Sequence, residues 1–429
     1  MNAHIISKKN DVVTMQVQVK LTNSMLQTEE NIQVALNETG NIITSEALEY
    51  FDTDGSPITI GSIKLTSKGL ISKEYQTPFG AIVVDRHVYQ SSEGGKTYCP
   101  LEKDAHIILA STPRFAKMIS SKYSRLGAPH VCRDFEENHK RKVVLSCIQQ
   151  VANLVGSLAQ ATEEKWTYSV PKLESHVEIV TVGLDGTTML MCKEGWREAM
   201  TGTISLFDEF GERLHTIYIG ATPEYGKAIF LDRLDTELTY VKQMYPDATY
   251  VGLADGAPVN WEFLEKRTDI QTLDFWHASE YLTKVADAAF PKKIEERKFW
   301  LDEACHKLKH NKTGADVIMK DMRFFIEEKP LTKDAQEKIA KSLTYFKNHK
   351  TLMNYSDNAE ENYPIGSGVT EAACKVIVKE RLCCSGMRWK EEGAAGVIAL
   401  RCLNYSTGRW EQFWEKIDRY GVPEVECVH

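Results

Sequence analysis

The chain has 429 residues, of which 42% are hydrophobic and 26% charged, and its formal net charge is −8. This composition is ordinary for a folded globular protein. No apolar run reaches the roughly 20 residues that a membrane-spanning helix needs, and the first residues contain no apolar signal-peptide segment. The ten cysteines include no C-x-x-C pair. They indicate reduced thiols, so we expect a cytoplasmic protein without a membrane partner.

The acidic net charge counts against a nucleic-acid partner, because proteins that bind duplex DNA are usually basic. Two stretches are basic nevertheless. Residues 114–142 carry eight basic and three acidic side chains, and residues 375–390 carry five basic and one acidic side chain. Local patches matter more for binding than the total charge. Both stretches are compatible with DNA binding and equally with solvated surface.

Residues 1–104 are predicted to form a β-rich region. Apolar and polar side chains alternate over residues 12–22, which predicts a strand. Strand-like runs fill residues 57–100 and are interrupted by turn sequences at 77–80 and 92–97, which predicts hairpins.

Residues 105–172 are predicted to form a small helical DNA-binding module. Apolar residues recur there every three or four positions: Val144, Ile148, Val151, Val155 and Leu158. A basic cluster precedes this run, and we expect its Lys140, Arg141 and Lys142 to contact DNA. No turn signature identifies a helix-turn-helix.

From residue 173 the pattern becomes α/β, because strand-like and helix-like segments alternate, and we expect a sheet covered by helices. The first part of this domain spans 173–290, with a hairpin at 201–221 and a helix at 224–244. Residues 291–361 are charged and helical and predict an inserted helical domain. The last part, 362–405, is expected to be one long helix from Gly368 to about Cys402. A tail, 406–429, follows.

The most informative motifs are Asp185-Gly and Asp255-Gly, each of which comes after an apolar strand. Ligands of open α/β sheets bind beyond the carboxyl ends of the strands, so both carboxylates are predicted to face one crevice. Carboxylates are typical ligands of Mg²⁺, and two ions about 4 Å apart support phosphodiester chemistry. The structural alternative is that Asp-Gly simply favours a turn.

Glu371 is the third candidate carboxylate, in the first turn of the helix that follows Gly366-Ser367-Gly368. It shares one helix face with Lys375 and Lys379 at a spacing of four residues. A surface Glu–Lys pair is the alternative interpretation.

These motifs together resemble a known family. The order GLDGT, LADGA, DFWHASEYL and IGSGVTEAACKVIVKERLCCSGMRWK is similar to DDE transposases of the bacterial ISKra insertion-sequence family, distant relatives of Mutator-like elements. The resemblance covers residues 70 to 403, and its last block is the most specific part.

The resemblance implies an RNase H-like catalytic core with a helical insertion. It implies a DNA transposase that cleaves and joins double-stranded DNA at terminal inverted repeats, working as a homodimer or higher oligomer on DNA in the bacterial nucleoid. The family's acidic residues correspond to Asp185, Asp255 and Glu371, which would hold two Mg²⁺ or Mn²⁺ ions.

Further roles follow for residues near these motifs. Asp274 and His277 match a D-x-x-H motif, so His277 is a weaker catalytic candidate, with a structural histidine as the alternative. Lys375 and Lys379 would line the DNA path. Arg388 and Trp389 would clamp a DNA end, since Arg and aromatic side chains bind unstacked bases. A buried Trp beside an Arg is the alternative.

The sequence departs from the family at one place. Ser91 and Ser92 stand where many relatives have cysteines, and only Cys99 remains, so we do not expect an N-terminal zinc site. Two other functions stay open. One is a transposase-derived DNA-binding protein without catalytic activity. The other is an actin-like ATPase. The sequence lacks the second glycine-rich phosphate loop that such an ATPase would need, and this function gives Glu371 no role.

Overall fold

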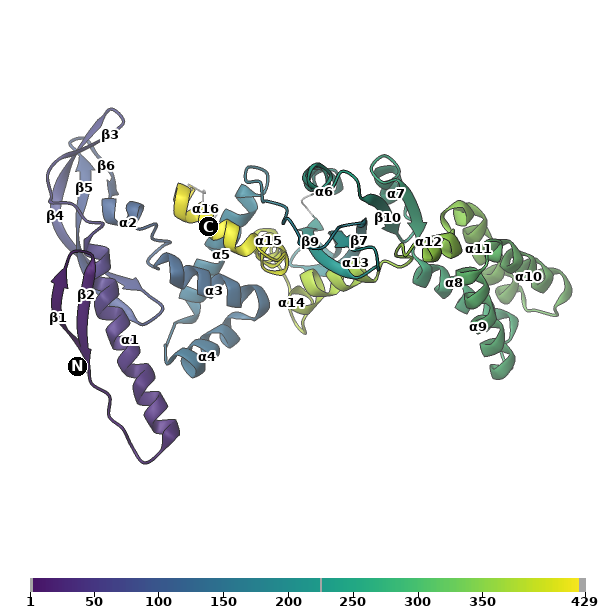
Figure 1. The fold of residues 1–429 in the computed structure, drawn as a ribbon, viewed down its shortest axis with the longest axis horizontal. Helices are drawn as coiled ribbons and strands as arrows, with labels where there is room; N and C mark the ends of the chain where they lie inside the picture. The colour runs from purple at the N-terminus through teal and green to yellow at the C-terminus, as the bar shows by residue number, and fades with distance from the viewer. Residues whose placement is uncertain (1–2, 224–225, 424–429) are drawn as a thin grey trace. The chain divides into compact units, whose positions relative to one another are not determined.

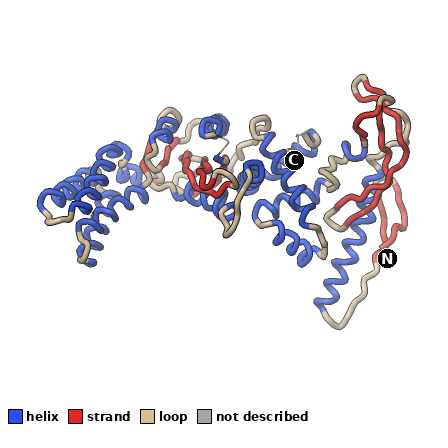
Figure 2. Tube along the Cα trace, turned by 180° about the vertical axis from the view of Figure 1, so that it is seen from behind, coloured by secondary structure: helices blue, strands red, loops and turns tan. Residues whose placement is uncertain are grey.

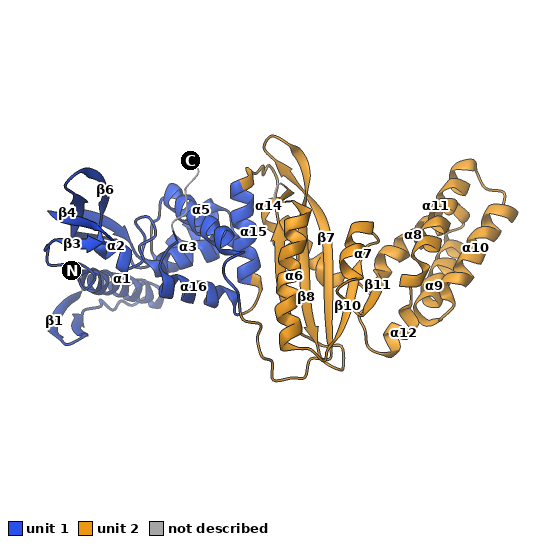
Figure 3. Cartoon of the chain, turned by 90° about the horizontal axis from the view of Figure 1, so that it is seen from above, with its two compact units in different colours: residues 1–168, 392–404, 408–429 blue, residues 169–391, 405–407 orange. Residues whose placement is uncertain are grey.

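The structure is a computed structural model that describes residues 3–223 and 226–423. The chain divides into two compact units (Figure 3). Unit 1 contains residues 1–168, 392–404 and 408–429, and unit 2 contains residues 169–391 and 405–407. The fold is mixed α/β, as predicted, and the described strands form three separate sheets.

Unit 1 begins with two antiparallel sheets (Figures 1 and 2). The first is a hairpin of β1 (Ala3–Lys9) and β2 (Val12–Val17). The second has the order β3-β4-β5-β6. Its strands are β3 (Ile58–Ile60), β4 (Ile63–Gln76), β5 (Ala81–Ser91) and β6 (Gly94–Tyr98). The chain turns between β4 and β5 and between β5 and β6, where the sequence predicts hairpins.

A long helix, α1 (Met25–Glu49), was not predicted and interrupts the β-rich region. Ser24 begins it by accepting a hydrogen bond from the backbone N–H of Gln27. Only three of its residues are buried. A helix that buries so few residues needs no regular spacing of apolar residues, and the sequence therefore carries little signal for it. The strand predicted over residues 12–22 is shorter in the structure, where it ends at Val17.

The remainder of unit 1 is helical. The helices are α2 (Pro100–Asp104), α3 (Pro113–Arg125), α4 (Ala128–His139), α5 (Leu145–Thr162), most of α15 (Glu391–Tyr405) and α16 (Arg409–Tyr420). A Cβ atom on Gly156 of α5 would lie 2.9 Å from the Cα of Gly396 on α15, so the two helix backbones touch. Residues 392–404 of α15 therefore belong to unit 1. The sequence had predicted that the α/β domain continues to residue 405.

Unit 2 is built on a five-stranded sheet of order β11-β10-β7-β8-β9. Strands β7 (Ile179–Met191), β8 (Gly195–Phe207) and β9 (Arg213–Ala221) form an antiparallel meander. On the other side of β7, strands β10 (Thr249–Ala254) and β11 (Ile270–Leu273) continue the sheet in parallel. The connecting helices are α6 (Lys227–Met244) and α7 (Pro258–Leu264). Residues 224–225 of the predicted 224–244 helix lie outside the described residues.

Residues 291–361, predicted as an inserted helical domain, form part of a larger bundle of helices that leaves the sheet after β11 (Figure 3). The bundle begins at Phe275 and not at residue 291. It consists of α8 (Phe275–Ala289), α9 (Ile294–His310), α10 (Gly314–Glu328), α11 (Lys333–His349), the 3₁₀ helix η2 (Lys350–Leu352) and α12 (Tyr355–Glu360). Its apolar residues, such as Leu282, Ile318 and Ile339, are fully buried and continue the core of the sheet.

The single long helix predicted after Gly368 is wrong. The chain forms α13 (Gly368–Ala373), a π-helix η3 (Cys374–Lys379) and α14 (Glu380–Leu382), and then breaks before α15. The break holds Gly386 at φ +76° and pairs Trp389 with Met191 at the end of β7. A main-chain turn and a strand-like bridge thus replace about two helical turns.

No described helix has a segment both apolar and long enough to cross a bilayer. The nine cysteines of the described residues are all free thiols.

The contact of α5 with α15 provides a test of the unit 1 fold. Gly156→Val is expected to destabilise the chain by about 1–3 kcal/mol, because its side chain meets the Gly396 backbone and not a flexible side chain. Gly368→Ala is the control, since nothing lies within 4 Å of its added Cβ. Equal melting temperatures for both variants would contradict this packing.

Candidate active site

Asp185 lies within strand β7 and not at its end, which corrects the sequence analysis. The strand continues for six residues beyond Asp185, to Met191, and Asp185 pairs with Thr201 of β8. The Asp-Gly sequence therefore does not form a turn here. The long partner strand β8 explains this, because its ladder of hydrogen bonds with β7 continues through Gly186.

Asp255 follows β10 directly, as predicted. Strands β7 and β10 are parallel, with Gly183 opposite Leu253. Two residues further along each strand are Asp185 and Asp255, so the register brings both carboxylates to the same level. Neighbouring strands lie about 4.8 Å apart, which makes these two residues close neighbours.

Helix α13 brings Glu371 to this part of the sheet by packing directly on β7. A Cβ atom on Gly183 would lie only 2.0 Å from Oγ1 of Thr370, the residue before Glu371. The Thr370 side chain is 3% exposed and shares a 2.8 Å hydrogen bond with Thr203 of β8. Glycine at 183 is therefore required for the close approach of α13.

Asp274 anchors the segment that returns from the helical insertion. It is 1% exposed and begins α8, where its Oδ1 accepts a 2.7 Å hydrogen bond from the His277 N–H. Its Oδ2 accepts a 2.5 Å hydrogen bond from the N–H of Ser367. The N–H of Phe275 donates to the carbonyl of Ile365 at 3.0 Å. These bonds join the start of the insertion to its end, four residues before Glu371.

The sequence singled out Asp274 as the first residue of the D-x-x-H motif. The signal for its anchoring role was available, because Asp at the first position before a helix is a common cap. The hydrogen bond to Ser367 depends on tertiary structure and has no sequence signal.

The carboxylates repel one another. Burial raises the pKa of Asp185, and the charges of Asp255 and Glu198 raise it further. The N–H of Gly186, at 2.7 Å, and the thiol of Cys374, at 3.5 Å, donate to Asp185 and oppose this shift. Burial and the Asp185 charge raise the pKa of the Cys374 thiol to about 12, so it remains protonated and can donate.

Glu371 belongs to the same electrostatic cluster. Partial burial raises its pKa, followed by repulsion from Asp274 and, more weakly, from Asp185. Its Oε1 is 3.4 Å from the Ser367 hydroxyl, although the residue as a whole is exposed. Glu371 therefore lies within electrostatic reach of both Asp274 and Asp185.

The three carboxylates are neighbours without forming a finished metal site. Within residues 3–223 and 226–423, no three His, Cys, Asp or Glu side chains are already arranged to hold an ion. The donor chemistry fits a divalent cation nonetheless. Carboxylate oxygens are hard ligands, and in the described part of the chain no lysine or arginine forms an ion pair with Asp185, Asp255 or Glu371.

Lys375 and Lys379 are exposed, as is Glu371, while Cys374, Ile377 and Val378 face the core. The intervening turn is the π-helix η3, which carries an extra residue and widens the spacing between these side chains. The two lysines keep their predicted place on the outer face of this segment.

Arg388 and Trp389 differ in their solvent exposure and in their contacts. Arg388 is exposed. The Trp389 indole N–H donates to the carbonyl of Leu382 at 2.9 Å, and the Arg381 guanidinium lies 5.2 Å from its ring centre. Trp389 is partly buried and stabilises the break after α14 through these contacts.

His277 lies beside an aromatic cluster. Its ring contacts Tyr281 and Tyr345, which stack on each other at 3.8 Å. The Tyr345 hydroxyl donates a 3.1 Å hydrogen bond to the Asp255 carbonyl. Tyr345, on the inserted helix α11, has no local sequence signal and was missed.

The basic cluster of unit 1 is largely engaged within the protein. Arg141 is buried and bonds the carbonyls of Thr77 and Lys142, which corrects its assignment to DNA binding. Lys140 forms a 2.6 Å ion pair with Glu30. Lys142 is 88% exposed and lies 3.6 Å from Glu136. Of the three residues, Lys142 is the most accessible to a phosphate.

Comparison with models of known protein families gives no match, and comparison with curated proteins gives none either.

The contact of Gly183 with Thr370 can be tested by a double-mutant cycle. Gly183→Ala is expected to destabilise unit 2 by about 1–3 kcal/mol, because the new methyl group collides with Thr370. Thr370→Ala removes the colliding oxygen, so the double variant should recover part of the loss in thermal unfolding. Strict additivity of the two effects would show that α13 does not press on β7.

The raised pKa of Asp185 predicts a pH dependence. Between its ordinary value of 3.8 and the raised folded value, the folded chain binds more protons than the unfolded chain. The free energy of unfolding therefore falls as the pH rises through this window, and the loss persists above it. Asp185→Asn should remove this loss, on the order of 1 kcal/mol per pKa unit.

The measurement is urea unfolding of both proteins at pH values below and above this window. Asp247→Asn, an exposed position between α6 and β10, serves as the control and should follow the wild type. A parallel pH dependence for Asp185→Asn and wild type would contradict the raised pKa of Asp185.

Proposed function

We propose that this chain is a DDE-type DNA transposase, with unit 2 as an RNase H-like catalytic core interrupted by the helical insertion. The observation that carries the proposal is the neighbourhood of three carboxylates from distant parts of the sequence. Asp185 and Asp255 lie on adjacent parallel strands, and Glu371 is carried by the helix that packs on Gly183. The family resemblance of the sequence motifs supports the same function.

Asp185, Asp255 and Glu371 would hold two Mg²⁺ or Mn²⁺ ions. Bound there, the ions would supply charge stabilisation for the attacking and leaving oxygens of a phosphodiester. Burial raises the pKa of Asp185 and of Glu371, and repulsion from neighbouring carboxylates raises it further. Bound cations would offset that repulsion. Asp185 would be a central ligand of this site, because its register on β7 places it beside Asp255 and its charge acts on Glu371.

The remaining residues of the site would position and attract the substrate. Asp274 is a positioning residue, since its two hydrogen bonds fix the start of α8 and the loop before Glu371. Lys375 and Lys379 present exposed positive charge on the segment that carries Glu371 and would attract the phosphates of terminal inverted repeats. A homodimer or higher oligomer on DNA would bring two ends together.

A transposase-derived DNA-binding protein without catalytic activity is the second candidate. One observation favours it, namely that the described carboxylates do not form a ready metal site. Cleavage assays separate it from the first candidate.

Cleavage by the full chain is expected on DNA that carries the sequences flanking its gene, in the presence of Mg²⁺ or Mn²⁺. Asp185→Asn, Asp255→Asn and Glu371→Gln should each lower the rate roughly 10³-fold or more, because each removes a charged ligand. Asp247→Asn is the matched control and should cleave normally. EDTA should stop the reaction.

DNA binding in EDTA should be unchanged in all of these variants, since the carboxylates do not hold the DNA. Cleavage that survives in Asp185→Asn, or that proceeds in EDTA, would sink the assignment. Normal DNA binding by a wild-type chain that never cleaves would support the second candidate.

A further inference from the structure

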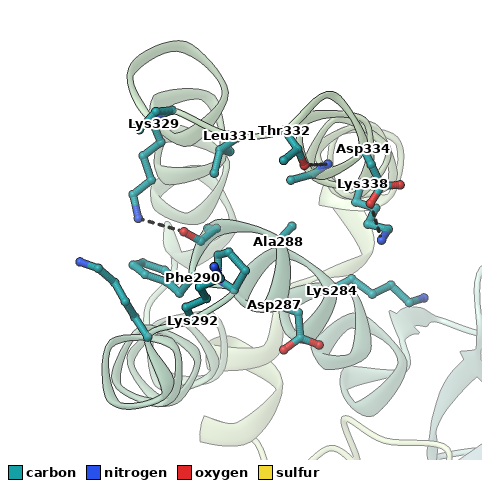
Figure 4. Close-up of a pocket in the computed structure, with 15 residues that line it drawn as sticks. Lys284, Asp287, Ala288, Phe290, Lys292, Lys329, Leu331, Thr332, Asp334 and Lys338 are labelled. Atoms are coloured by element: carbon teal, nitrogen blue, oxygen red, sulfur yellow. Dashed lines mark hydrogen bonds and ion pairs between the residues drawn. The ribbon is translucent and has the colours of Figure 1, made fainter.

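A groove runs along the helical insertion between α8 and α11. It consists of two adjoining cavities of about 690 Å³ and 450 Å³. Lys284 and Lys338 line both cavities, so the two form one continuous depression. Figure 4 shows the larger part, where side chains of α8 and α11 face one another across the hollow.

The groove is strongly basic in a chain that is acidic overall. Six lysines line it against two aspartates. The lysines are Lys284, Lys292, Lys293, Lys329, Lys338 and Lys341. Both aspartates are already neutralised, because Asp334 pairs with Lys338 at 2.7 Å and Asp287 pairs with Arg297 at 2.9 Å. In the described ranges, Lys284, Lys292 and Lys341 form no ion pair.

The lysines form a rim above an apolar floor. The floor includes Ala288, Phe290 and Leu331 (Figure 4). The Lys329 ammonium lies 3.4 Å from the centre of the Phe290 ring and donates to the Ala289 carbonyl at 3.5 Å. The Lys329 charge therefore lies over an aromatic ring of the floor, in a cation–π contact.

The inner end of the groove reaches the candidate active site. Lys338, Lys341, Tyr345 and His349 follow one face of α11 at intervals of three or four residues. Tyr345 bonds the Asp255 carbonyl, and His349 lies 3.2 Å from where a Cβ atom on Gly256 would be. From Lys338 to His349 the helix rises about 16 Å, which equals roughly five base-pair steps of DNA.

We propose that the groove between α8 and α11 binds the sugar–phosphate backbone of the duplex DNA that extends away from the carboxylates. The inference rests on the proposed function and identifies where its substrate lies. Lysine ammonium groups are flexible point charges, which suit phosphates at any base sequence. A linear track that ends beside Asp255 fits a polymer of evenly spaced phosphates better than a compact acidic ligand.

The test is DNA binding by the full chain in EDTA, with a fluorescent duplex of mixed sequence at several salt concentrations. The variant Lys284→Gln/Lys292→Gln/Lys341→Gln removes three unpaired charges of the groove. Each lost phosphate contact lowers the slope of log affinity against log salt by about 0.9, so the slope should fall by roughly 2.7. Replacing the same lysines with Arg keeps the charge and should preserve the slope.

The control variant is Lys298→Gln/Lys320→Gln/Lys347→Gln. It removes the same charge from exposed positions of the insertion that do not line the groove. Equal slopes for the groove variant and this control would overturn the proposal. So would a groove variant that loses binding to poly-glutamate while its DNA slope stays at the wild-type value, since the occupant would then be an acidic protein.

The cleavage assay distinguishes a failure of this inference from a failure of the proposed function. A wild-type chain that cleaves DNA, together with a groove variant of unchanged slope, leaves the function standing and removes the groove. A reduced slope in a chain that never cleaves leaves the groove as a DNA site and removes the nuclease.

Discussion

The arrangement of unit 2 depends on one close contact, the packing of α13 on strand β7 at Gly183. Because Gly183 has no side chain, Thr370 reaches the sheet and bonds Thr203 in a buried position. Any side chain at 183 would push the helix outward and carry Glu371 away from Asp185. The same contact explains why Glu371, which is 116 residues from Asp255 in sequence, belongs to its neighbourhood.

A second constraint is the closure of the helical insertion at its base. The insertion leaves the sheet after β11 and returns before α13, and Asp274 joins both ends through backbone N–H groups. Phe275 and Ile365 add a backbone hydrogen bond to this junction. The junction therefore fixes the chain four residues before Glu371. Its inner helix α11 in turn contacts the loop after β10 through Tyr345.

The charged side chains of the two units are arranged differently. In unit 1 the basic residues largely serve the protein itself, as Arg141 and Lys140 illustrate with their bonds to nearby groups. In unit 2 negative charge gathers at the carboxylates and unpaired positive charge gathers along the groove beside them. A cluster of like charges costs folding free energy unless a ligand offsets it. Such uncompensated clusters are typical of sites that bind ions or charged substrates.

The sequence by itself determined the local elements and the candidate carboxylates. Alternating and helical spacing predicted the hairpins of residues 57–100, the strand–helix order of unit 2 and the helical insertion, because these patterns follow from local geometry. Helix α1 was not predicted because few of its side chains are buried. The helix predicted after Gly368 was too long because its break depends on the pairing of Trp389 with β7. Tertiary structure alone decided that Asp185 lies inside a strand, that Arg141 is buried, and that Asp274 and Tyr345 support the site. Each of these outcomes depends on partners distant in the chain, whose proximity no local pattern encodes.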